Sequence, residues 1–494
     1  MNKQLKAISR VIFGMFIVLF FSVTMIQFVT ADELRDHELN QRSIKNSYKI
    51  ERGSILVSGD PVAYSTPTED SYRFERQYSA GELYAPVTGY FSRTQGMTGL
   101  ENLMNQDLSG QSGAQFFTRI MRTVTGEAPQ GSSVETTLDP VVQQATWDAM
   151  QGFNGAAVAI VPDTGEVLAM VSTPSYDPNL LSLNDDAQVI ANYAQLENDP
   201  GNPLFNRAIG GDLYHPGSTY KLLTAAAAIE SGAATPTSTF ANPASLQLPQ
   251  SSAVMTNAWD GTCGDGGAQT TLMQAITQSC NIPIAELAMS MDRNAVPEMA
   301  RAFGFERELS IPLSVTPSVS PNPLDQAQTA LSSIGQLDVR ATPLQMAMIS
   351  AGIANEGVVM TPHLVSRVIT PDLRTEREYE PSEFSQPISE STAQALQSMM
   401  EQVIAAPDGS GRLAYIEGAR MGGKTGTAEN GDDANGDPRP DTLWFTGYAF
   451  MGENQVAIAV VIEDGGGEEY GFAGRSSELP VRVGKQIMEA VLNQ

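Results

Sequence analysis

The chain has 494 residues, a formal net charge of −27 and two cysteines. Its length predicts two or three domains, and its acidic balance argues against nucleic acid as a partner, because no basic surface could neutralise the phosphates. Cys263, Cys280 and the three histidines show no zinc-ligand spacing, so we expect neither a metal nor a cofactor.

The N-terminus predicts a membrane anchor. Residues 1–10 carry three cations, and residues 11–30 are mostly apolar over the length that spans a bilayer as a helix. Acidic residues follow at once, so we expect residues 1–10 in the cytoplasm and the rest of the chain outside. The alternative is a cleaved signal peptide with Val29-Thr30-Ala31 as its cleavage site, but the length of the run favours a permanent single-pass anchor in the cell membrane.

Residues 31–135 predict a first extracellular domain of mixed, strand-rich character. It contains, in chain order, a polar stalk, a strand start, a stretch of short strands and loops, and two helices: 32–48, 50–56, 61–98, 100–108 and 114–124. No catalytic constellation stands out here, which indicates an interaction or spacer domain.

Residues 136–494 predict a second domain of the α+β class. Asp139-Pro140 marks a helix start, and a β-hairpin is expected over 156–171. The stretches 174–203 and 230–270 are expected as a polar connection and as loops. Further helices and strands are expected at 270–278, 284–291, 342–355, 391–404, 443–450 and 456–462, with an amphipathic helix at the C-terminus. Because turns join the last strands, the sheet is expected to be antiparallel.

One stretch predicts a reactive serine. His215-Pro216-Gly217-Ser218-Thr219-Tyr220-Lys221 is expected to be a tight turn that starts a buried helix, since residues 222–229 are almost all apolar. Ser218 stands at the cap or first turn, and Lys221 shares its face of the helix. An apolar wall favours the neutral amine, which can accept the serine proton. The pattern also arises by chance, but only Lys221, of seven lysines, follows a serine at this spacing.

Two further stretches place polar groups where a cleft could form. A helix expected from Thr270 breaks at Gln278-Ser279-Cys280-Asn281, so three polar side chains meet between two helices; an ordinary capping turn is the alternative. Gly423-Lys424-Thr425-Gly426-Thr427 precedes an acidic turn, 429–441, and two strands. The residues from Gly418 to Thr425 match a phosphate-binding loop pattern, but no helix start follows and the acids would repel a nucleotide. We therefore do not expect nucleotide binding.

In chain order, Ser218-x-x-Lys221, Ser279-x-Asn281 and Lys424-Thr425-Gly426 resemble the active-site motifs of penicillin-binding proteins and serine β-lactamases. Further stretches resemble that family's opening hairpin, a segment of its transpeptidase domains, and the start of the pedestal of its class B members: 155–179, 334–345, and 40–42 with 52–55. In length and over 84–90 the chain is most similar to the actinobacterial penicillin-binding protein A group. Cys280 departs from β-lactamases, which often carry aspartate there.

The resemblance implies a β-lactamase/transpeptidase-like domain, an antiparallel sheet flanked by helices, for residues 136–494, with residues 31–135 as the pedestal. It implies a serine-type D,D-transpeptidase that cross-links peptidoglycan and is acylated by β-lactams. Ser218 would attack a D-Ala-D-Ala stem peptide, and an amine of a neighbouring stem would resolve the acyl-enzyme. Roles in cell-wall synthesis, cell shape and division follow, with other proteins of these processes as partners of the pedestal.

The resemblance also implies the catalytic roles. Lys221 would take the Ser218 proton, a role worth roughly 10²–10⁴-fold in rate. Ser279 would relay a proton towards the leaving amine, and Asn281 would hold Lys221 and the substrate amide. Lys424 would help to keep Lys221 neutral and would attract the substrate carboxylate.

The remaining implied roles lie along the third motif. Thr425 and Thr427 would donate hydrogen bonds to the substrate carboxylate. Gly426 would let the substrate backbone approach closely. The backbone N–H groups of Ser218 and Thr427 would form the oxyanion hole, where each donor is worth roughly 10²–10³-fold.

Cys263 and Cys280 are the only cysteines of a chain that is expected to be exported, so we hypothesise a disulfide. A loop of that size would contribute on the order of 3 kcal/mol and would pin the Ser279 loop. Two free buried thiols are the alternative.

Three other functions fit parts of the pattern. A β-lactamase or a D,D-carboxypeptidase on the same fold needs water to resolve the acyl-enzyme, and no dedicated deacylating base stands out. A non-enzymatic penicillin-binding sensor needs a signalling portion, for which the ten residues before the anchor leave no room. The anchor and the extra domain favour a cross-linking enzyme.

Overall fold

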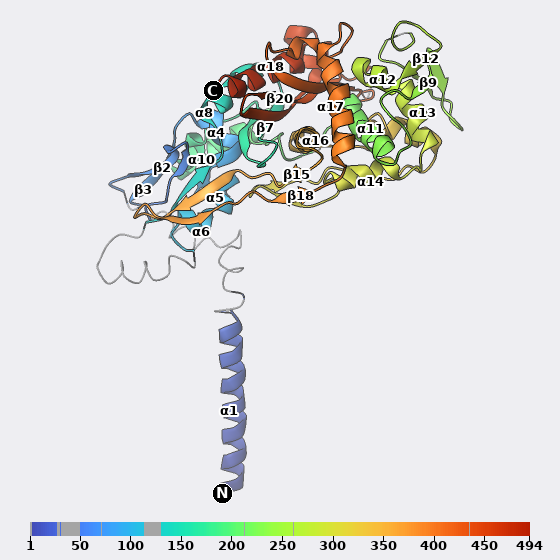
Figure 1. Ribbon diagram of the computed structural model, residues 1–494. Coiled ribbons are helices and arrows are strands. Elements are labelled where there is room, and N and C mark those ends of the chain that lie inside the picture. The colour runs from blue at the N-terminus through green and yellow to red at the C-terminus, as the bar shows by residue number, and fades with distance from the viewer. Residues whose placement is uncertain are drawn as a thin grey trace.

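The computed structural model describes residues 2–26, 30, 50–70, 72–112, 130–211, 213–259, 261–433 and 435–494. The stalk expected at 32–48 and the helix expected at 114–124 lie outside the described residues. The first element is α1 (Asn2–Thr24), of which Lys6–Thr24 is long and apolar enough to cross a membrane, with a mean hydropathy of 2.1 (Figure 1). This helix begins and ends earlier than the expected anchor at 11–30.

A five-stranded antiparallel sheet forms the centre of the C-terminal part. Its strand order is β19-β20-β21-β7-β8, made of β7 (Gly155–Ile160), β8 (Val167–Thr173), β19 (Arg420–Ala428), β20 (Thr442–Met451) and β21 (Asn454–Ile462). The predicted hairpin and the predicted late strands are therefore present, in the antiparallel arrangement that their turns indicated.

Helices cover both faces of this sheet because its residues alternate between two apolar cores. Trp444, Tyr448 and Ala457 belong to the core that contains α16 (Pro343–Ala354). Phe445 and Ile458 belong to the opposite core, which is closed by α8 (Pro140–Met150) and α18 (Leu479–Leu492) (Figure 1). The predicted start of α8 is confirmed, since the Asp139 carboxylate accepts hydrogen bonds from the first turn.

A second, six-stranded sheet joins distant parts of the sequence. Its order is β17-β16-β6-β1-β2-β3, made of β1 (Ile55–Val57), β2 (Asp60–Pro67), β3 (Phe74–Tyr78), β6 (Ser133–Thr136), β16 (Val365–Ile369) and β17 (Thr375–Glu378). Antiparallel pairing of β16 with β6 ties the N-terminal sheet to the C-terminal part of the chain. The sequence did not predict this pairing, because β16 is short and only one of its residues is buried.

A cluster of buried charges holds the N-terminal part together. Glu101 is fully buried, and its carboxylate pairs with Arg52 Nε at 2.5 Å and with Arg76 Nε at 2.6 Å. Tyr78 OH donates to the same carboxylate at 3.3 Å. We call Arg52, Arg76 and Glu101 the pedestal charge cluster.

Several elements differ from expectation. The stretch 61–98 contains a helix, α4 (Gly81–Thr88), and the connection 174–203 contains α10 (Asp186–Glu197), which was missed because only one of its residues is buried and it shows no apolar stripe. The helix expected at 100–108 is divided into α5 (Gly99–Leu103) and α6 (Asn105–Leu108). Thr270 is the middle residue of the short strand β12 (Gln269–Thr271), and α12 (Leu272–Gln278) begins two residues later than expected.

The remaining helices and strands are mostly short, with the exceptions of α11, α13, α14 and α17. They are β4 (Phe91–Ser92), β5 (Gly96–Met97), α9 (Asn179–Ser182), η3 (Gly217–Tyr220), α11 (Lys221–Glu230), β9 (Thr239–Ala241), β10 (Ser245–Gln247), β11 (Val254–Thr256), α13 (Ile282–Ser290), α14 (Ala295–Ala302), β13 (Leu309–Ser310), β14 (Ser314–Val315), α15 (Gln326–Ser332), β15 (Val359–Met360), β18 (Glu383–Ser385), α17 (Glu390–Ala405), η4 (Arg412–Ala414), η5 (Asp464–Gly466) and η6 (Glu468–Tyr470).

Candidate active site

Ser218 lies in a tight turn against the edge strand of the central sheet. It is half-buried within the 3₁₀ turn η3, and the buried helix α11 starts at Lys221. No side chain caps η3, so Ser218 is a first-turn residue and not a cap. Gly217 has φ 51°, and a Cβ there would lie 2.4 Å from the Thr427 carbonyl oxygen. Only glycine permits this contact between the turn and β19.

Hydrogen bonds from three directions hold the turn. Gly217 N donates to the Gly335 carbonyl at 3.1 Å, and Trp444 Nε1, from β20, donates to the His215 carbonyl at 2.9 Å. Within the turn, Thr219 Oγ1 donates to the Pro216 carbonyl at 2.6 Å. The position of Ser218 is therefore set by the sheet and not by α11 alone.

The second motif contacts Lys221 directly. Ser279 sits between α12 and α13 in a left-handed conformation, φ 68°. Lys221 Nζ donates to the Ser279 carbonyl and to Asn281 Oδ1, both at 2.7 Å, and lies 3.5 Å from Ser279 Oγ. None of these three bonds reaches Ser218; catalytic hydrogen bonds are often long in a free enzyme and tighten when substrate binds.

Two residues that the sequence did not single out orient Asn281. Its Nδ2 donates to the Thr256 carbonyl at 2.8 Å, and its backbone N donates to Asn257 Oδ1 at 2.8 Å. With Nδ2 occupied, Oδ1 is the amide atom left to face Lys221. Thr256 ends the short strand β11 and Asn257 follows it, in a stretch that was expected to be loop, and no spacing signal marked either residue.

The third motif also contacts Ser279, the serine of the second motif. Lys424 lies inside β19, and its Nζ donates to Ser279 Oγ at 2.7 Å and to the Thr425 carbonyl at 3.0 Å. Ser279 Oγ therefore stands between the two amines. Since Gly423-Lys424-Thr425 lies within a strand, the phosphate-binding loop pattern is not realised, as expected.

Burial of the two lysines sets their protonation. Both side chains are fully buried. Desolvation lowers the pKa of Lys424 to about 7. Desolvation, together with the nearby charge of Lys424, lowers the pKa of Lys221 well below its usual value. Burial therefore favours the neutral amine of Lys221, which is the form that can accept a proton.

The side chains of the other third-motif residues make specific contacts. Thr425 Oγ1 donates to Ser410 Oγ at 2.8 Å, and Thr427 Oγ1 donates to Ser476 Oγ at 2.8 Å. A Cβ on Gly426 would lie 2.9 Å from the Pro216 carbonyl oxygen, so glycine is required where β19 passes the serine turn. Ser410 and Ser476 lie in polar loops, and nothing in their local sequence pointed to the site.

A disulfide joins Cys263 to Cys280. Cys280 is the middle residue of the second motif and is fully buried. Asn242 holds the other end, because its side chain exchanges two hydrogen bonds of 2.7 Å with the Cys263 backbone. The bond thus ties the Ser279 loop to the loop that follows β11.

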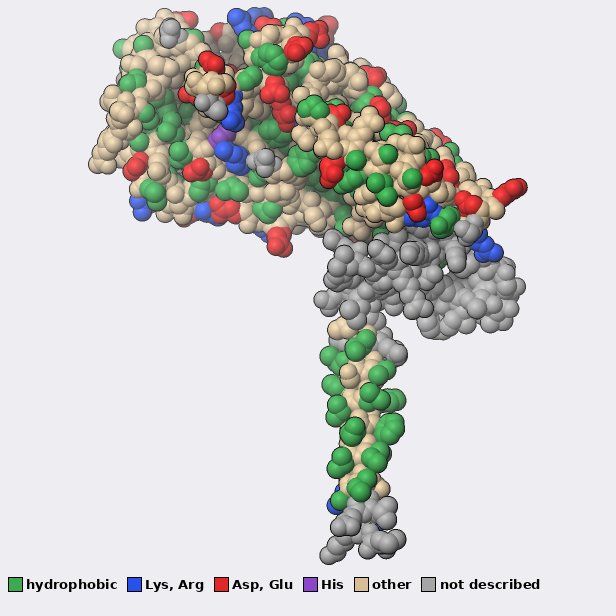
Figure 2. All heavy atoms as spheres, turned by 180° about the vertical axis from the view of Figure 1, so that it is seen from behind, with side chains coloured by type: hydrophobic (Ala, Val, Ile, Leu, Met, Phe, Trp, Pro, Cys, Tyr) green, Lys and Arg blue, Asp and Glu red, His purple; other side chains and the backbone are tan. Residues whose placement is uncertain are grey.

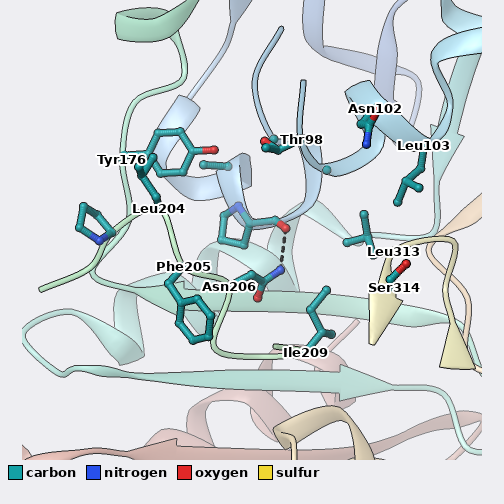
Figure 3. A pocket seen from close by; sticks show the side chains of 15 residues that line it. Thr98, Asn102, Leu103, Tyr176, Leu204, Phe205, Asn206, Ile209, Leu313 and Ser314 are labelled. Carbon is teal, nitrogen blue, oxygen red and sulfur yellow. Dashed lines mark hydrogen bonds between the residues drawn. The ribbon is translucent and has the colours of Figure 1, made fainter. Parts of the chain in front are cut away.

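The three motifs meet around one hydroxyl–amine centre. A serine at a helix start, a buried amine of lowered pKa three residues later, and a second serine between two amines are the groups that acyl transfer through a serine ester requires. This centre is separate from a hollow of about 260 Å³ between α4 and the 203–209 segment, where Asn206 Nδ2 donates to the Pro86 carbonyl (Figure 3). That hollow contains no residue of the three motifs.

Comparison with known protein families agrees with this geometry. Residues 155–489 match the penicillin binding protein transpeptidase domain, and residues 52–134 match the penicillin binding protein A dimerisation domain. The peptidoglycan D,D-transpeptidase PbpA of Mycolicibacterium smegmatis is 38% identical over the full length of both chains. PbpA of Mycobacterium tuberculosis is also 38% identical, over 100% of this chain and 99% of its own.

Solved structures extend the likeness to three dimensions. Penicillin-binding protein A from M. tuberculosis as a ceftriaxone acyl-enzyme superposes with a TM-score of 0.85 at 36% identity, over 90% of this chain and 99% of that one. Its penicillin G acyl-enzyme gives a TM-score of 0.81 at 35% identity, over 90% and 100%. This chain therefore belongs to the penicillin-binding protein transpeptidase family, in the penicillin-binding protein A group of peptidoglycan D,D-transpeptidases.

Proposed function

We propose that the protein cross-links peptidoglycan through an acyl-enzyme on Ser218. Ser218 Oγ attacks the carbonyl of the D-Ala-D-Ala bond of a stem peptide, an ester forms, and the last D-Ala leaves as an amine. The amine of a neighbouring stem then attacks the ester, which forms the cross-link and returns the proton to Ser218. A β-lactam acylates the same oxygen when its ring opens.

The observation that carries this proposal is the state of Lys221. Lys221 follows Ser218 by three residues and is fully buried, and its pKa is strongly lowered. Its amine donates hydrogen bonds to the Ser279 carbonyl and to Asn281 Oδ1. In the proposed mechanism Lys221 accepts the Ser218 proton, and Ser279 Oγ passes a proton to the leaving amine. Lys424, hydrogen-bonded to Ser279 Oγ, favours the neutral state of Lys221 by its charge.

The substrate carboxylate is proposed to bind along β19. Lys424 supplies positive potential, and Thr425 and Thr427 lie two residues apart on the strand. Gly426 keeps the strand edge clear for the substrate backbone. The backbone N–H groups of Ser218 and Thr427 are proposed as the oxyanion hole, and the contact between Gly217 and Thr427 supports their proximity.

The site is proposed to act outside the cell. We assign residues 1–10 to the cytoplasm, 11–30 to a single membrane anchor, 31–135 to a pedestal and 136–494 to the transpeptidase domain. The pedestal is proposed to bind other proteins of cell-wall synthesis or division. The apolar helix α1 supports the anchor, because one helix of this length and composition suffices for a single span.

Labelling with a fluorescent penicillin tests the nucleophile. We expect Ser218→Ala to abolish covalent labelling, and Ser231→Ala, at the other end of the same helix, to label as the unaltered protein does. Equal labelling of Ser218→Ala and the unaltered protein would overturn the assignment.

A stem-peptide analogue with an added amine acceptor then tests the reaction. We expect the amide-linked product to form. Release of D-Ala with only hydrolysed peptide would indicate a D,D-carboxypeptidase, and rapid loss of the penicillin label would indicate a β-lactamase.

A further inference from the structure

Both threonines of the third motif are paired with a serine from a different loop. Thr425 is bonded to Ser410, in the loop after α17, and Thr427 is bonded to Ser476, in the loop before α18, each at 2.8 Å. Thr425 and Thr427 are two residues apart on one strand, so they lie on the same face at a spacing of about 7 Å. The two hydroxyl pairs therefore flank one short length of β19.

The direction of these bonds leaves the serines as the available donors. In each pair the threonine hydroxyl donates and the serine oxygen accepts. A hydroxyl has one proton to donate, so the threonine protons are used, whereas neither Ser410 Oγ nor Ser476 Oγ donates to any other described residue. Thr425 is also 3% exposed while Ser410 is half-buried, so a ligand meets Ser410 first.

Ser410 is held in place by α12, the helix that leads into the second motif. Its backbone N donates to the Thr277 carbonyl at 3.2 Å. Two residues earlier, Asp408 Oδ2 accepts from Gln274 Nε2 at 2.7 Å and from Gln278 Nε2 at 2.6 Å. Gln278 directly precedes Ser279, so the loop that carries Ser410 is fixed to the catalytic side of α12.

Local donors matter here because the chain as a whole is strongly acidic. The chain carries a net charge of −27, and Asp and Glu side chains are spread over the face shown in Figure 2. Lys424 is fully buried, and desolvation removes much of its tendency to stay charged. A bound carboxylate therefore depends on nearby hydroxyl donors, and hydrogen bonds to an ionised acceptor are about twice as strong as neutral ones.

We propose that Ser410 and Ser476 are substrate-binding residues that donate hydrogen bonds to the terminal carboxylate of the stem peptide and to the carboxylate of a β-lactam. Thr425 and Thr427 then serve in part to orient these serine hydroxyls. The inference rests on the proposed function, since it assumes that an acyl donor with a carboxylate occupies the cleft next to Ser218.

The test compares a penicillin with its methyl ester, which differ in the carboxylate charge. The rate constant for acylation of Ser218 is measured for both compounds, and their ratio gives the selectivity for the carboxylate. We expect Ser410→Ala and Ser476→Ala each to lower this ratio about tenfold, the scale of one hydrogen bond to a charged group. Ser410→Thr, which keeps a hydroxyl, is expected to restore most of it.

Ser382→Ala is the matched control. Ser382 Oγ donates to Thr361 Oγ1 at 3.1 Å, a serine–threonine pair that contains none of the motif residues, and its loss is expected to leave the ratio unchanged. An unchanged ratio in the Ser410→Ala/Ser476→Ala protein overturns the inference, including the case where both compounds slow equally, because that result means a structural role only. If one variant fails to fold, as shown by its thermal transition, the other decides. Failure of the proposed function is a separate result, namely labelling that persists in Ser218→Ala.

Discussion

The pedestal charge cluster and the candidate active site each bury two basic side chains, but in opposite ways. In the pedestal, Arg52 and Arg76 share the carboxylate of Glu101. Burial alone would raise the pKa of Glu101, but the charges of Arg76 and Arg52 together with their hydrogen bonds outweigh burial and lower it. In the candidate active site, the described hydrogen-bond partners of Lys221 and Lys424 are all neutral, namely the backbone, Ser279 and Asn281, and the pKa values of both lysines fall.

This difference distinguishes a structural role of buried charges from a role in proton transfer. Arginine stays charged in proteins, so two buried arginines need a carboxylate, and the paired cluster fixes the fold. Lysine can lose its proton when desolvated, so two buried lysines without a carboxylate produce an amine that accepts protons. Each region can be converted towards the other by one substitution.

The largest effect is expected from Asn281→Asp, which introduces a carboxylate next to Lys221. A carboxylate 2.7 Å from Nζ would favour the charged amine and raise the pKa of Lys221. Loss of the proton acceptor should slow acylation by penicillin about 10²–10⁴-fold near pH 7. The acylation rate constant is measured from pH 6 to 10, and the defect should shrink as pH rises and Lys221 loses its proton.

Asn281→Ala is the control for that experiment, because it removes the same hydrogen bond without adding charge. Its defect should be smaller than that of Asn281→Asp near neutral pH and should not recover at high pH. Parallel pH profiles for the two variants would show that charge at this position is not what matters.

Glu101→Gln is the converse change, and it leaves two buried arginines unpaired. Breaking a buried ion pair in this way costs about 3–5 kcal/mol, so the free energy of unfolding from a denaturant titration should fall by that amount. Glu489→Gln removes the carboxylate of an exposed pair with Lys485 and should leave it unchanged. Equal effects of the two changes would mean that the pedestal charge cluster does not hold the fold.

The smallest effect concerns pH, and it follows from Lys424. Its pKa of about 7 in the folded protein compares with 10.5 for an ordinary lysine. Between these values the unfolded chain binds one more proton than the folded one, so stability should rise with pH in that window. Over the same range Lys424 loses its charge, and acylation by penicillin should fall by up to about tenfold per pH unit above 7.

Denaturant titrations at pH 7 and 9 and a pH–rate profile measure both trends. Lys424→Met should remove the part of the stability difference between pH 7 and pH 9 that comes from this lysine. A rate that stays constant up to pH 9 would contradict the lowered pKa.

The motifs could be predicted from the sequence because each depends on local spacing. Ser218 and Lys221 are three residues apart, and Ser279 and Asn281 flank one helix break. The helix starts at Asp139 and Thr342 carry capping signals, and their positions agree with the structure. By contrast, the bonds that bring Lys221, Ser279 and Lys424 together span up to 145 residues, and no local pattern encodes them.

What was missed has common physical causes. The helix α10 is almost wholly exposed, so no apolar period marks it. Thr256, at the end of a short strand, and three loop residues, Asn257, Ser410 and Ser476, each contribute a backbone carbonyl or a single polar group, and their partners are 15 to 49 residues away in the sequence. The pairing of β16 with β6 depends on the short strand β16, which has only one buried residue and therefore no apolar pattern that would distinguish it from a loop. Tertiary contacts decide such cases, and one sequence does not show them.

The pairing of β16 with β6 also constrains the order in which the chain can fold during its synthesis. Strand β6 ends at Thr136, but its neighbour β16 begins only at Val365. At about 5–20 residues per second, the ribosome needs roughly ten to fifty seconds to make the intervening chain. Until then β6 presents an open edge that could pair with other strands. Although β6 is made early, its sheet is therefore among the last parts of the chain to be completed, and a fragment that ends before residue 365 lacks the strand that completes it.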